Sequence, residues 1–324
     1  MVGVAISIVR MKDLLAVVML LGIYSLLSAS FFVTMDAVDV AFTEAAVGAG
    51  VSTLLMLVAI TMTGRKEHPT RHKPLLAIVV VIITGSLLIY GTLDMPRFGL
   101  AEAPIHQHVA PRYINDSMQE IGVPNIVTSV LASYRAFDTF GEVVVIFTAG
   151  MGVLALLSMV RRSEDTENID SNNYSMHEQH LILRIVSKML IPFILMFAFY
   201  VQFHGDFGPG GGFQAGVIFA SAIFLYTMLF GMNTARRVIN QAFIQILAAT
   251  GVLLYGSVGV VSLLNGKSFF DYSALASDPI AGQHLGILLI ELGVGITVAA
   301  VMIIIFFNFA DRRNYSPNKD SENS

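Results

Sequence analysis

Carboxyl side chains that fall inside long apolar segments are the groups of this chain best suited to chemistry. Glu44 lies in AFTEAAVGAG with Asp39 just before it, Glu142 lies in FDTFGEVVV four residues after Asp138, and Glu291 lies in LLIELGVG. A charge inside a bilayer costs at least about 2.5 to 3.5 kcal/mol, so each such residue is a candidate for ion or proton transport. Apolar surroundings disfavour the charged form of a carboxyl, which allows proton exchange by Glu44 and Glu291, neither of which has an obvious basic partner in the sequence.

A structural role is the alternative for these carboxyls. Arg135 precedes Asp138 by three residues and Glu142 by seven, so the three side chains lie on one face of a helix. An ion pair or a hydrogen bond to a facing helix would then hold the bundle together without any part in transport. For Asp138 and Glu142 both interpretations remain open.

A second unusual feature is the string HGDFGPGGGFQAG, from His204 to Gly216. Proline and three successive glycines cannot continue an ordinary helix, so we expect a tight turn with close backbone approach. Gly212 and Gly216 form a small-xxx-small pair that favours close helix packing. Nucleotide binding is not favoured, because no lysine followed by Ser/Thr stands in the required place. The predicted packing motif comprises Pro209, Gly210, Gly211, Gly212, Phe213 and Gly216.

Histidines and the absent cysteines limit the possible cofactors. His204, beside the glycine string, is a candidate for proton exchange. The pairs His106/His108 and His177/His180 have no further ligands near them, so we expect no metal site. Without cysteine the chain cannot hold an iron–sulfur cluster, and we expect no cofactor. The net charge of −4 and the scattered basic residues argue against binding nucleic acid.

The elements that carry these residues are predicted to be transmembrane helices. Of 324 residues 55% are hydrophobic and 13% are charged, and the mean hydropathy is +0.71. Runs near 20 apolar residues match the roughly 30 Å hydrocarbon layer, and they lack the alternation of barrel strands, so the predicted class is all-α, in contact with membrane lipid. The eight predicted spans are Leu14 to Val33, Val40 to Met62, Leu75 to Thr92, Phe137 to Val160, Leu183 to Phe203, Phe213 to Gly231, Ala242 to Leu264 and His284 to Ala310.

The distribution of basic residues predicts the orientation. With eight spans, all of the 19 lysines and arginines fall on one side except Arg97, Arg112, Arg135 and Lys267. The basic side is expected to be cytoplasmic, which places both termini there. The stretch Val2 to Val9 is apolar but too short to span, and we do not count it as a helix.

Polar segments divide the chain. The segment 163–180 is acidic, contains no lysine or arginine, and is expected to be a cytoplasmic linker. We therefore predict two small modules at 1–73 and 74–162, a four-helix module at 181–310 and a disordered tail at 311–324. Neither half repeats the other, so an inverted-repeat transporter is not indicated.

These strings resemble a known family. YVQFHGDFGPGGGFQAGVIFASAIFLY, within residues 181–310, is similar to the signature of the B subunit of Mrp-type sodium/proton antiporters. DVAFTEAAVGAGVSTLL and NIVTSVLASYRAFDTFGEVVVIFTAGMGVLALL resemble the two modules that end the A subunit, which also occur as the D and E subunits of membrane-bound hydrogenases. The first of these modules normally begins with one more full span, so the resemblance implies an incomplete start.

The resemblance implies a non-catalytic subunit of a multisubunit antiporter that exchanges Na⁺ or K⁺ for H⁺ in the bacterial inner membrane. The implied partners are the other subunits of that complex, like its A, C, D, E, F and G subunits. Glu44, Asp138 and Glu142 match positions thought to line an ion path, and Glu291 stands where B subunits usually have an acidic residue. A membrane-arm subunit of an energy-converting hydrogenase remains the alternative.

Overall fold

The computed structural model describes residues 1–67, 74–161 and 181–313, and these residues fold almost entirely into helices. Eight helical segments of the described part are long and apolar enough to cross a membrane, which confirms the predicted class and the number of spans. The spanning segments are α2 (Leu14–Thr34), α3 to α4 (Val38–Thr63), α5 (Pro74–Thr92), α10 (Ala136–Arg161), α11 (Leu181–His204), α12 (Gly212–Phe230), α14 (Gln241–Leu264) and α15 (Pro279–Arg313).

Short helices fill the connections. They are α1 (Val2–Arg10), α6 (Pro104–Gln107), α7 (Ala110–Asn115), α8 (Ser117–Glu120), α9 (Ile126–Thr128), α13 (Met232–Val238) and the 3-10 turn η3 (Tyr272–Ala274). Two segments have the wider π-helical winding: η1 (Glu44–Ser52), between α3 and α4, and η2 (Ser129–Tyr134), before α10. Such π segments are rare and are often found at functional sites, and η1 begins at Glu44.

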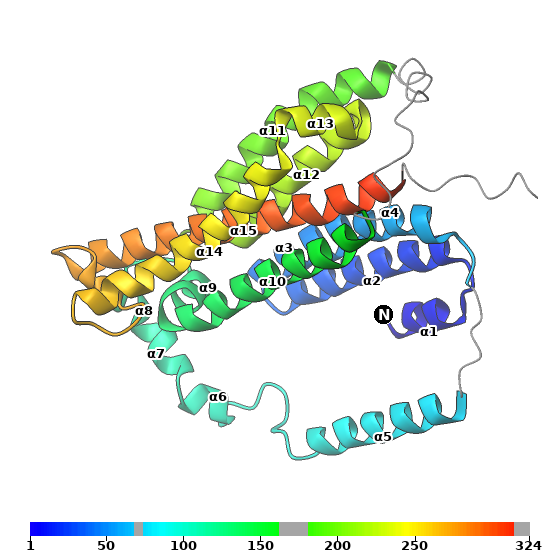
Figure 1. The fold of residues 1–324 in the computed structure, drawn as a ribbon. Helices are drawn as coiled ribbons and strands as arrows, with labels where there is room; N and C mark the ends of the chain where they lie inside the picture. The colour runs from blue at the N-terminus through cyan, green and yellow to red at the C-terminus, as the bar shows by residue number, and fades with distance from the viewer. Residues whose placement is uncertain (68–73, 162–180, 314–324) are drawn as a thin grey trace, which may run out of the picture.

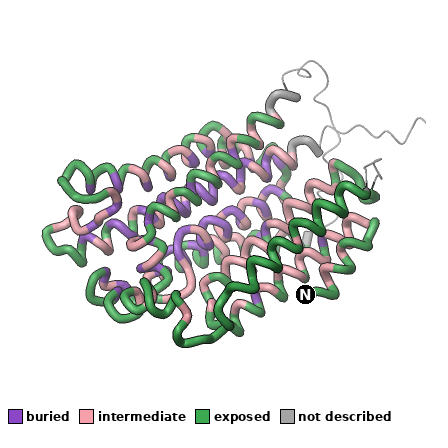
Figure 2. The backbone as a smooth tube through the Cα atoms, turned by 90° about the horizontal axis from the view of Figure 1, so that it is seen from below, coloured by how far each residue is buried: buried purple, intermediate pink, exposed green. Residues whose placement is uncertain are grey.

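The long helix α15 is the centre of the bundle. It packs against α10, α12, α14 and α4, as Figure 1 shows. Buried residues concentrate on these central helices, whereas the outlying helices are mostly exposed (Figure 2). A side chain such as Phe306 or Ile287 is almost fully buried although lipid would also accept it, so packing determines its place. The elements around α15 therefore have well-defined neighbours.

Glycines allow the close approach of helices at the centre. A Cβ on Gly251 of α14 would lie 2.6 Å from the carbonyl oxygen of Gly293 on α15. A Cβ on Gly293 would in turn lie 2.8 Å from the carbonyl oxygen of Gly251. This reciprocal contact brings the two backbones together, as is usual where small residues meet in membrane bundles.

Buried tyrosines join the two halves of the chain. The Tyr255 hydroxyl donates a 2.8 Å hydrogen bond to the Ala136 carbonyl, and the Tyr272 hydroxyl donates a 2.9 Å bond to the Ala132 carbonyl. Both tyrosines are fully buried. Since a buried hydroxyl needs a partner, these bonds hold α14 and η3 against the start of α10.

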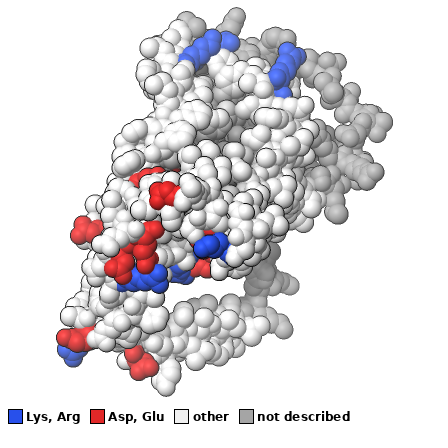
Figure 3. Space-filling model, turned by 90° about the vertical axis from the view of Figure 1, so that its left-hand side faces the viewer, with Lys and Arg blue, Asp and Glu red and all other residues white. Residues whose placement is uncertain are grey.

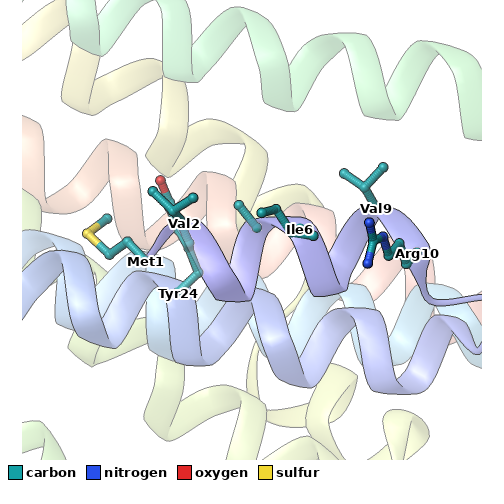
Figure 4. A pocket seen from close by; sticks show the side chains of 7 residues that line it. Met1, Val2, Ile6, Val9, Arg10 and Tyr24 are labelled. Carbon is teal, nitrogen blue, oxygen red and sulfur yellow. The ribbon is translucent and has the colours of Figure 1, made fainter.

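The helix α1 differs from what we expected for Val2 to Val9, which we did not count as a helix. It is an α-helix of nine residues, still too short to span a bilayer. It lies beside α2, and a pocket between them is lined by Met1, Val2, Ala5, Ile6, Val9, Arg10 and Tyr24 (Figure 4). No acidic side chain lines this pocket, so the candidate ion-path carboxyls lie elsewhere.

Two other expectations concern the polar segments. The expected linker 163–180 lies outside the described residues. The helix α15 continues to Arg313, three residues into the stretch from 311 that we expected to be a disordered tail, and the remainder of that stretch is also outside the described residues. The apolar run and the helix need not end together, because basic residues are tolerated in a last helical turn.

The helix α5 stands apart from the bundle in Figure 1. Its large apolar side chains are exposed all round, as Leu88, Ile89 and Tyr90 show. A Cβ on Gly85 or Gly91 would meet no other atom within 4 Å. In a membrane this surface faces lipid or a neighbouring subunit.

Candidate functional site

The glycine-rich turn of residues 205–211 joins α11 to α12 and is held by side chains from the first half of the chain. The Asn125 side-chain amide donates to the carbonyls of Gly205 and Gly208, at 3.1 Å each. The Thr128 hydroxyl donates to the Gly205 carbonyl at 2.7 Å. These bonds satisfy carbonyls that no helix can use, because the turn interrupts the helical ladder. Asn125 and Thr128 therefore fix the turn in place.

The carboxylate of Glu291 faces this turn. A Cβ on Gly211 would lie 3.0 Å from Glu291 Oε1, and one on Gly205 would lie 3.1 Å from the same atom. Gly211 has a φ of 98°, a conformation that favours glycine, and it is the N-cap of α12. Glu291 has no obvious partner in the sequence, but the fold places its carboxylate against the turn.

Gly212 and Gly216 bring α12 into backbone contact with α15. A Cβ on Gly212 would overlap the Glu291 carbonyl oxygen, and one on Gly216 would lie 2.7 Å from the Gly295 carbonyl oxygen. Phe213 follows Gly212 and packs against the core, and a Cβ on Gly210 would lie 2.7 Å from the Val201 carbonyl oxygen. The string that begins at Pro209 is thus a region of close backbone packing beside Glu291.

Asp206, inside the turn, lies opposite His284. Its Oδ2 atom is 4.0 Å from His284 Nδ1, and its other oxygen is buried without a hydrogen-bond partner within the described chain. Burial raises the pKa of Asp206, and a positive charge on His284 opposes that rise. The charge of Asp206 also acts on Glu291, so the two carboxylates repel each other.

A polar connection links this site to α3. The Gln214 side-chain amide donates to the Thr43 hydroxyl at 2.8 Å, and Thr43 directly precedes Glu44. Asn125 Nδ2 also lies 3.5 Å from Asp39 Oδ1. The structure therefore brings Asp39 to the same turn as Glu291, although the two residues are far apart in the sequence.

Glu44 itself faces α2. A Cβ on Gly48 would lie 2.7 Å from Glu44 Oε1 and 2.8 Å from the Ser25 hydroxyl oxygen, so Gly48 makes room for both polar groups. No ion pair to Glu44 occurs among the described residues. A partly buried carboxyl beside a hydroxyl is suited to proton exchange or to binding a cation.

The carboxyls of α10 are arranged differently. Asp138 forms an ion pair with Arg135, at 2.6 Å from Nε and 2.5 Å from an Nη nitrogen, and both side chains are exposed. Glu142 is also exposed, and its charge, like that of Glu291, acts on the buried Tyr255. Tyr255 thus lies within electrostatic range of a carboxylate on α10 and another on α15.

His204 ends α11 beside the turn. Its ring stacks on Tyr200 with centroids 4.9 Å apart, and a Cβ on Gly208 would lie 3.0 Å from its Nε2 atom. The stacking orients the ring, so that Nε2 points toward the turn. Its part in proton exchange remains a prediction.

Three residues of this site were missed by the sequence analysis: Asn125, Gln202 and His284. Asn125 holds the turn, His284 faces Asp206, and Gln202 of α11 reaches Gly295 of α15, where a Cβ would lie 2.5 Å from Gln202 Oε1. One signal was available for His284, since it stands seven residues before Glu291 and so on the same face of a helix. Nothing in the sequence indicated the other two.

The end of the bundle that carries this turn is acidic. Figure 3 views that end and shows carboxylates gathered across it. An ion cluster also lies in the connection before α9: Arg112 pairs with Glu120 at 3.0 Å, and Tyr134 donates a short hydrogen bond to the same carboxylate. These contacts lower the pKa of Glu120 and, with desolvation as the larger cause, raise the pKa of Tyr134 to about 12. Within residues 1–67, 74–161 and 181–313 no group of three potential metal ligands comes together.

Comparison with known proteins divides the chain into three matched regions. Residues 182–304 match the domain related to the MnhB subunit of Na⁺/H⁺ antiporters, residues 1–65 match the D subunit of MBH, and residues 75–173 match the E subunit of MBH. A "Putative antiporter subunit mnhB2" of Staphylococcus aureus is 33% identical over 142 residues, which cover 43% of this chain and all of that protein.

Longer proteins match nearly the whole chain. The A/B subunit of a "Probable K(+)/H(+) antiporter" of Rhizobium meliloti is 24% identical over 94% of this chain and 32% of its own length. The chain therefore spans about a third of that relative. A chain of the Mrp complex from Dietzia sp. superposes with a TM-score of 0.76 and 25% identity, covering 98% of this chain and 34% of the other.

An archaeal structure is also similar. A chain of the membrane-bound sulfane sulfur reductase, a respiratory membrane complex, gives a TM-score of 0.56 at 26% identity over 74% of this chain and 98% of the other. The MnhB match contains the glycine turn and Glu291, and the fold agrees with the Mrp complex over almost its full length. The chain therefore belongs to the family of the MnhB subunit of Na⁺/H⁺ antiporters, here preceded by regions related to the D and E subunits of MBH.

Proposed function

We propose that this chain is a membrane subunit of a multisubunit Mrp-type antiporter that exchanges a monovalent cation, Na⁺ or K⁺, for protons. The observation that carries the proposal is the position of Glu291, whose carboxylate is held inside the bundle against the glycine turn rather than in an ion pair. A carboxyl in that setting can take up and release a proton or a cation. The relatives named as antiporter subunits support the same reaction.

The proposed role is that of one subunit among several, in the bacterial inner membrane with both termini cytoplasmic. Glu44, Asp39, Asp138, Glu142, Glu291 and His204 would contribute to the ion or proton path. The exposed apolar surface of α5 supports the existence of partner subunits, because a helix exposed all round has room for a packed neighbour. We assign residues 1–73 and 74–162 to the two A-subunit-type modules and 181–310 to the B-subunit-type module.

A second candidate function follows from the matches to the D and E subunits of MBH and to the archaeal respiratory complex. The chain would then belong to the membrane arm of a redox-driven ion pump. The catalogue of proteins that co-purify with the tagged chain separates the two. Antiporter-like subunits without metal-cofactor subunits favour the first function, and nickel–iron or iron–sulfur subunits favour the second.

Glutamine variants test the transport role. Glutamine keeps the size and hydrogen-bonding capacity of glutamate but does not exchange a proton near neutral pH. In everted vesicles that contain the whole complex, Glu44→Gln and Glu291→Gln should lose most cation/proton exchange, while Glu44→Asp and Glu291→Asp should retain part of it. Assembly is measured in parallel by co-purification, and Glu102→Gln, in the exposed connection after α5, is the matched control. Normal exchange by both glutamine variants across the pH range would leave these carboxyls with a structural role only.

A further inference from the structure

One face of α15 carries a line of polar contacts that the proposed path does not yet include. His284, Glu291 and Gly295 are separated by seven and four residues, so they lie on one stripe of the helix. At 1.5 Å per residue, the stripe from His284 to Gly295 is about 16 Å long, or roughly half of the hydrocarbon layer. It begins at the acidic end of the bundle (Figure 3) and runs toward the middle.

Each position on the stripe has a polar group opposite it. Asp206 lies 4.0 Å from His284, the glycine turn lies against the Glu291 carboxylate, and the Gln202 side chain occupies the space beside Gly295. The sequence of groups from the surface inward is therefore imidazole with carboxylate, then carboxylate, then amide. Such groups exchange or relay protons through bound water.

Two atoms on this line are buried without partners. Within the described chain, neither Asp206 Oδ1 nor Gln202 Nε2 has a hydrogen-bond partner. Gln202 is only 7% exposed, and its side chain reaches toward α15. A buried polar atom without a protein partner is costly, and such atoms are usually satisfied by ordered water. The two orphan atoms lie at the two ends of the line, on either side of Glu291.

We propose that His284, Asp206, Glu291 and Gln202 line a water-filled proton-access path from the acidic end of the bundle into the B-subunit-type module. His284 and Asp206 form the outer exchange pair, because His284 is 44% exposed and Asp206 is partly exposed. Glu291 receives the proton, and Gln202 holds the water beyond it. A proton passes along this line by transfer between neighbouring oxygen and nitrogen atoms, so no bond other than those to hydrogen changes.

Other charged groups near the line act on its protonation. Asp206 and Glu291 repel each other, which favours a shared proton over two charges. Asp39 approaches from α3 through Asn125, His204 ends α11 beside the turn, and Tyr255 of α14 lies in the field of Glu291. Burial raises the pKa of Asp206, which brings its proton exchange closer to neutral pH.

The test uses the whole complex in everted vesicles, and it rests on the proposed antiport function. The variants are His284→Gln, Asp206→Asn and Gln202→Leu, each compared at equal amounts of assembled complex. His106→Gln, in an exposed loop helix, is the matched control. We expect about tenfold slower exchange in Asp206→Asn and Gln202→Leu, a changed pH profile in His284→Gln, and partial recovery in Asp206→Glu. The control should behave as the original complex.

The outcomes separate this path from the function on which it rests. If the unmodified complex shows no cation-dependent proton exchange, the antiport function itself is wrong. If it is active and the His284 and Asp206 variants keep its rate and pH profile, the path is wrong while the function stands. A changed affinity for Na⁺ or K⁺ with an unchanged pH profile would also overturn the path, because it identifies a cation site. If Asp206→Asn does not assemble, the more exposed His284→Gln decides.

Discussion

Replacing Gly216 by alanine tests the close packing of α12 on α15. The added Cβ would lie 2.7 Å from the Gly295 carbonyl oxygen, 3.0 Å from Val298 Cβ and 3.1 Å from the Ala299 nitrogen. Two of these three atoms belong to the backbone and cannot rotate away. The helices must therefore separate, or α12 must shift along α15.

The expected magnitude follows from two opposing effects. Overpacking a well-packed core costs about 1 to 3 kcal/mol. Alanine in place of glycine inside a helix returns up to about 1 kcal/mol. We therefore expect a net loss of about 0 to 2 kcal/mol for Gly216→Ala and a larger loss for Gly216→Val, whose branched side chain adds more overlap.

Gly152→Ala is the matched control, because Gly152 lies inside α10 and a Cβ there would meet no atom within 4 Å. The assay is thermal unfolding of the purified full chain in detergent, followed by size-exclusion chromatography. Gly216→Ala should unfold at a lower temperature than Gly152→Ala, and Gly216→Val should be lower still and should reduce the yield of complex. A Gly216→Ala protein as stable as the Gly152→Ala control would show that α12 and α15 do not meet at backbone distance.

Two further predictions concern hydroxyl groups. Tyr255→Phe removes the buried 2.8 Å hydrogen bond to the Ala136 carbonyl and should cost about 0.5 to 1.5 kcal/mol in unfolding free energy, whereas Tyr90→Phe on exposed α5 should change it little. Denaturant titration measures both, and equal effects would contradict the assigned contact. The Tyr134 hydroxyl and Arg112 lower the pKa of Glu120, so the stability that Glu120 contributes is present above its ordinary value of 4.5 and is lost as the pH falls through the lowered value. Glu120→Gln should therefore flatten the pH dependence of the melting temperature in this acidic range, and an unchanged slope would contradict the cluster.

Most span boundaries were predictable from the sequence, because hydropathy and length are local properties of each segment. Helix α15 is the exception, since it begins at Pro279 rather than at the expected His284. The Asp278 carboxylate accepts a hydrogen bond from the Ala281 nitrogen and so helps to start the helix before the apolar run. Helix α1 was missed for the opposite reason: its apolar run is too short to be recognised by a transmembrane criterion.

The glycine string predicted an interruption between two helices and a close contact, but not the partner in that contact. Asn125 illustrates the limit. It is a single polar residue in a connection, yet in the fold it holds two carbonyls of a turn some eighty residues away. A hydrogen bond of that kind leaves no periodic pattern in the sequence.

The sequence by itself determined that the chain lies in a membrane, where its spans run, and which family its motifs resemble. Each of these depends on the composition of one continuous segment. The tertiary structure decided which carboxyls meet: Glu291 with the glycine turn, Asp206 with His284, and Asp39 with Asn125. Those contacts depend on how helices from different parts of the chain pack together, and in a membrane that packing is set by small residues and interhelical hydrogen bonds rather than by hydropathy.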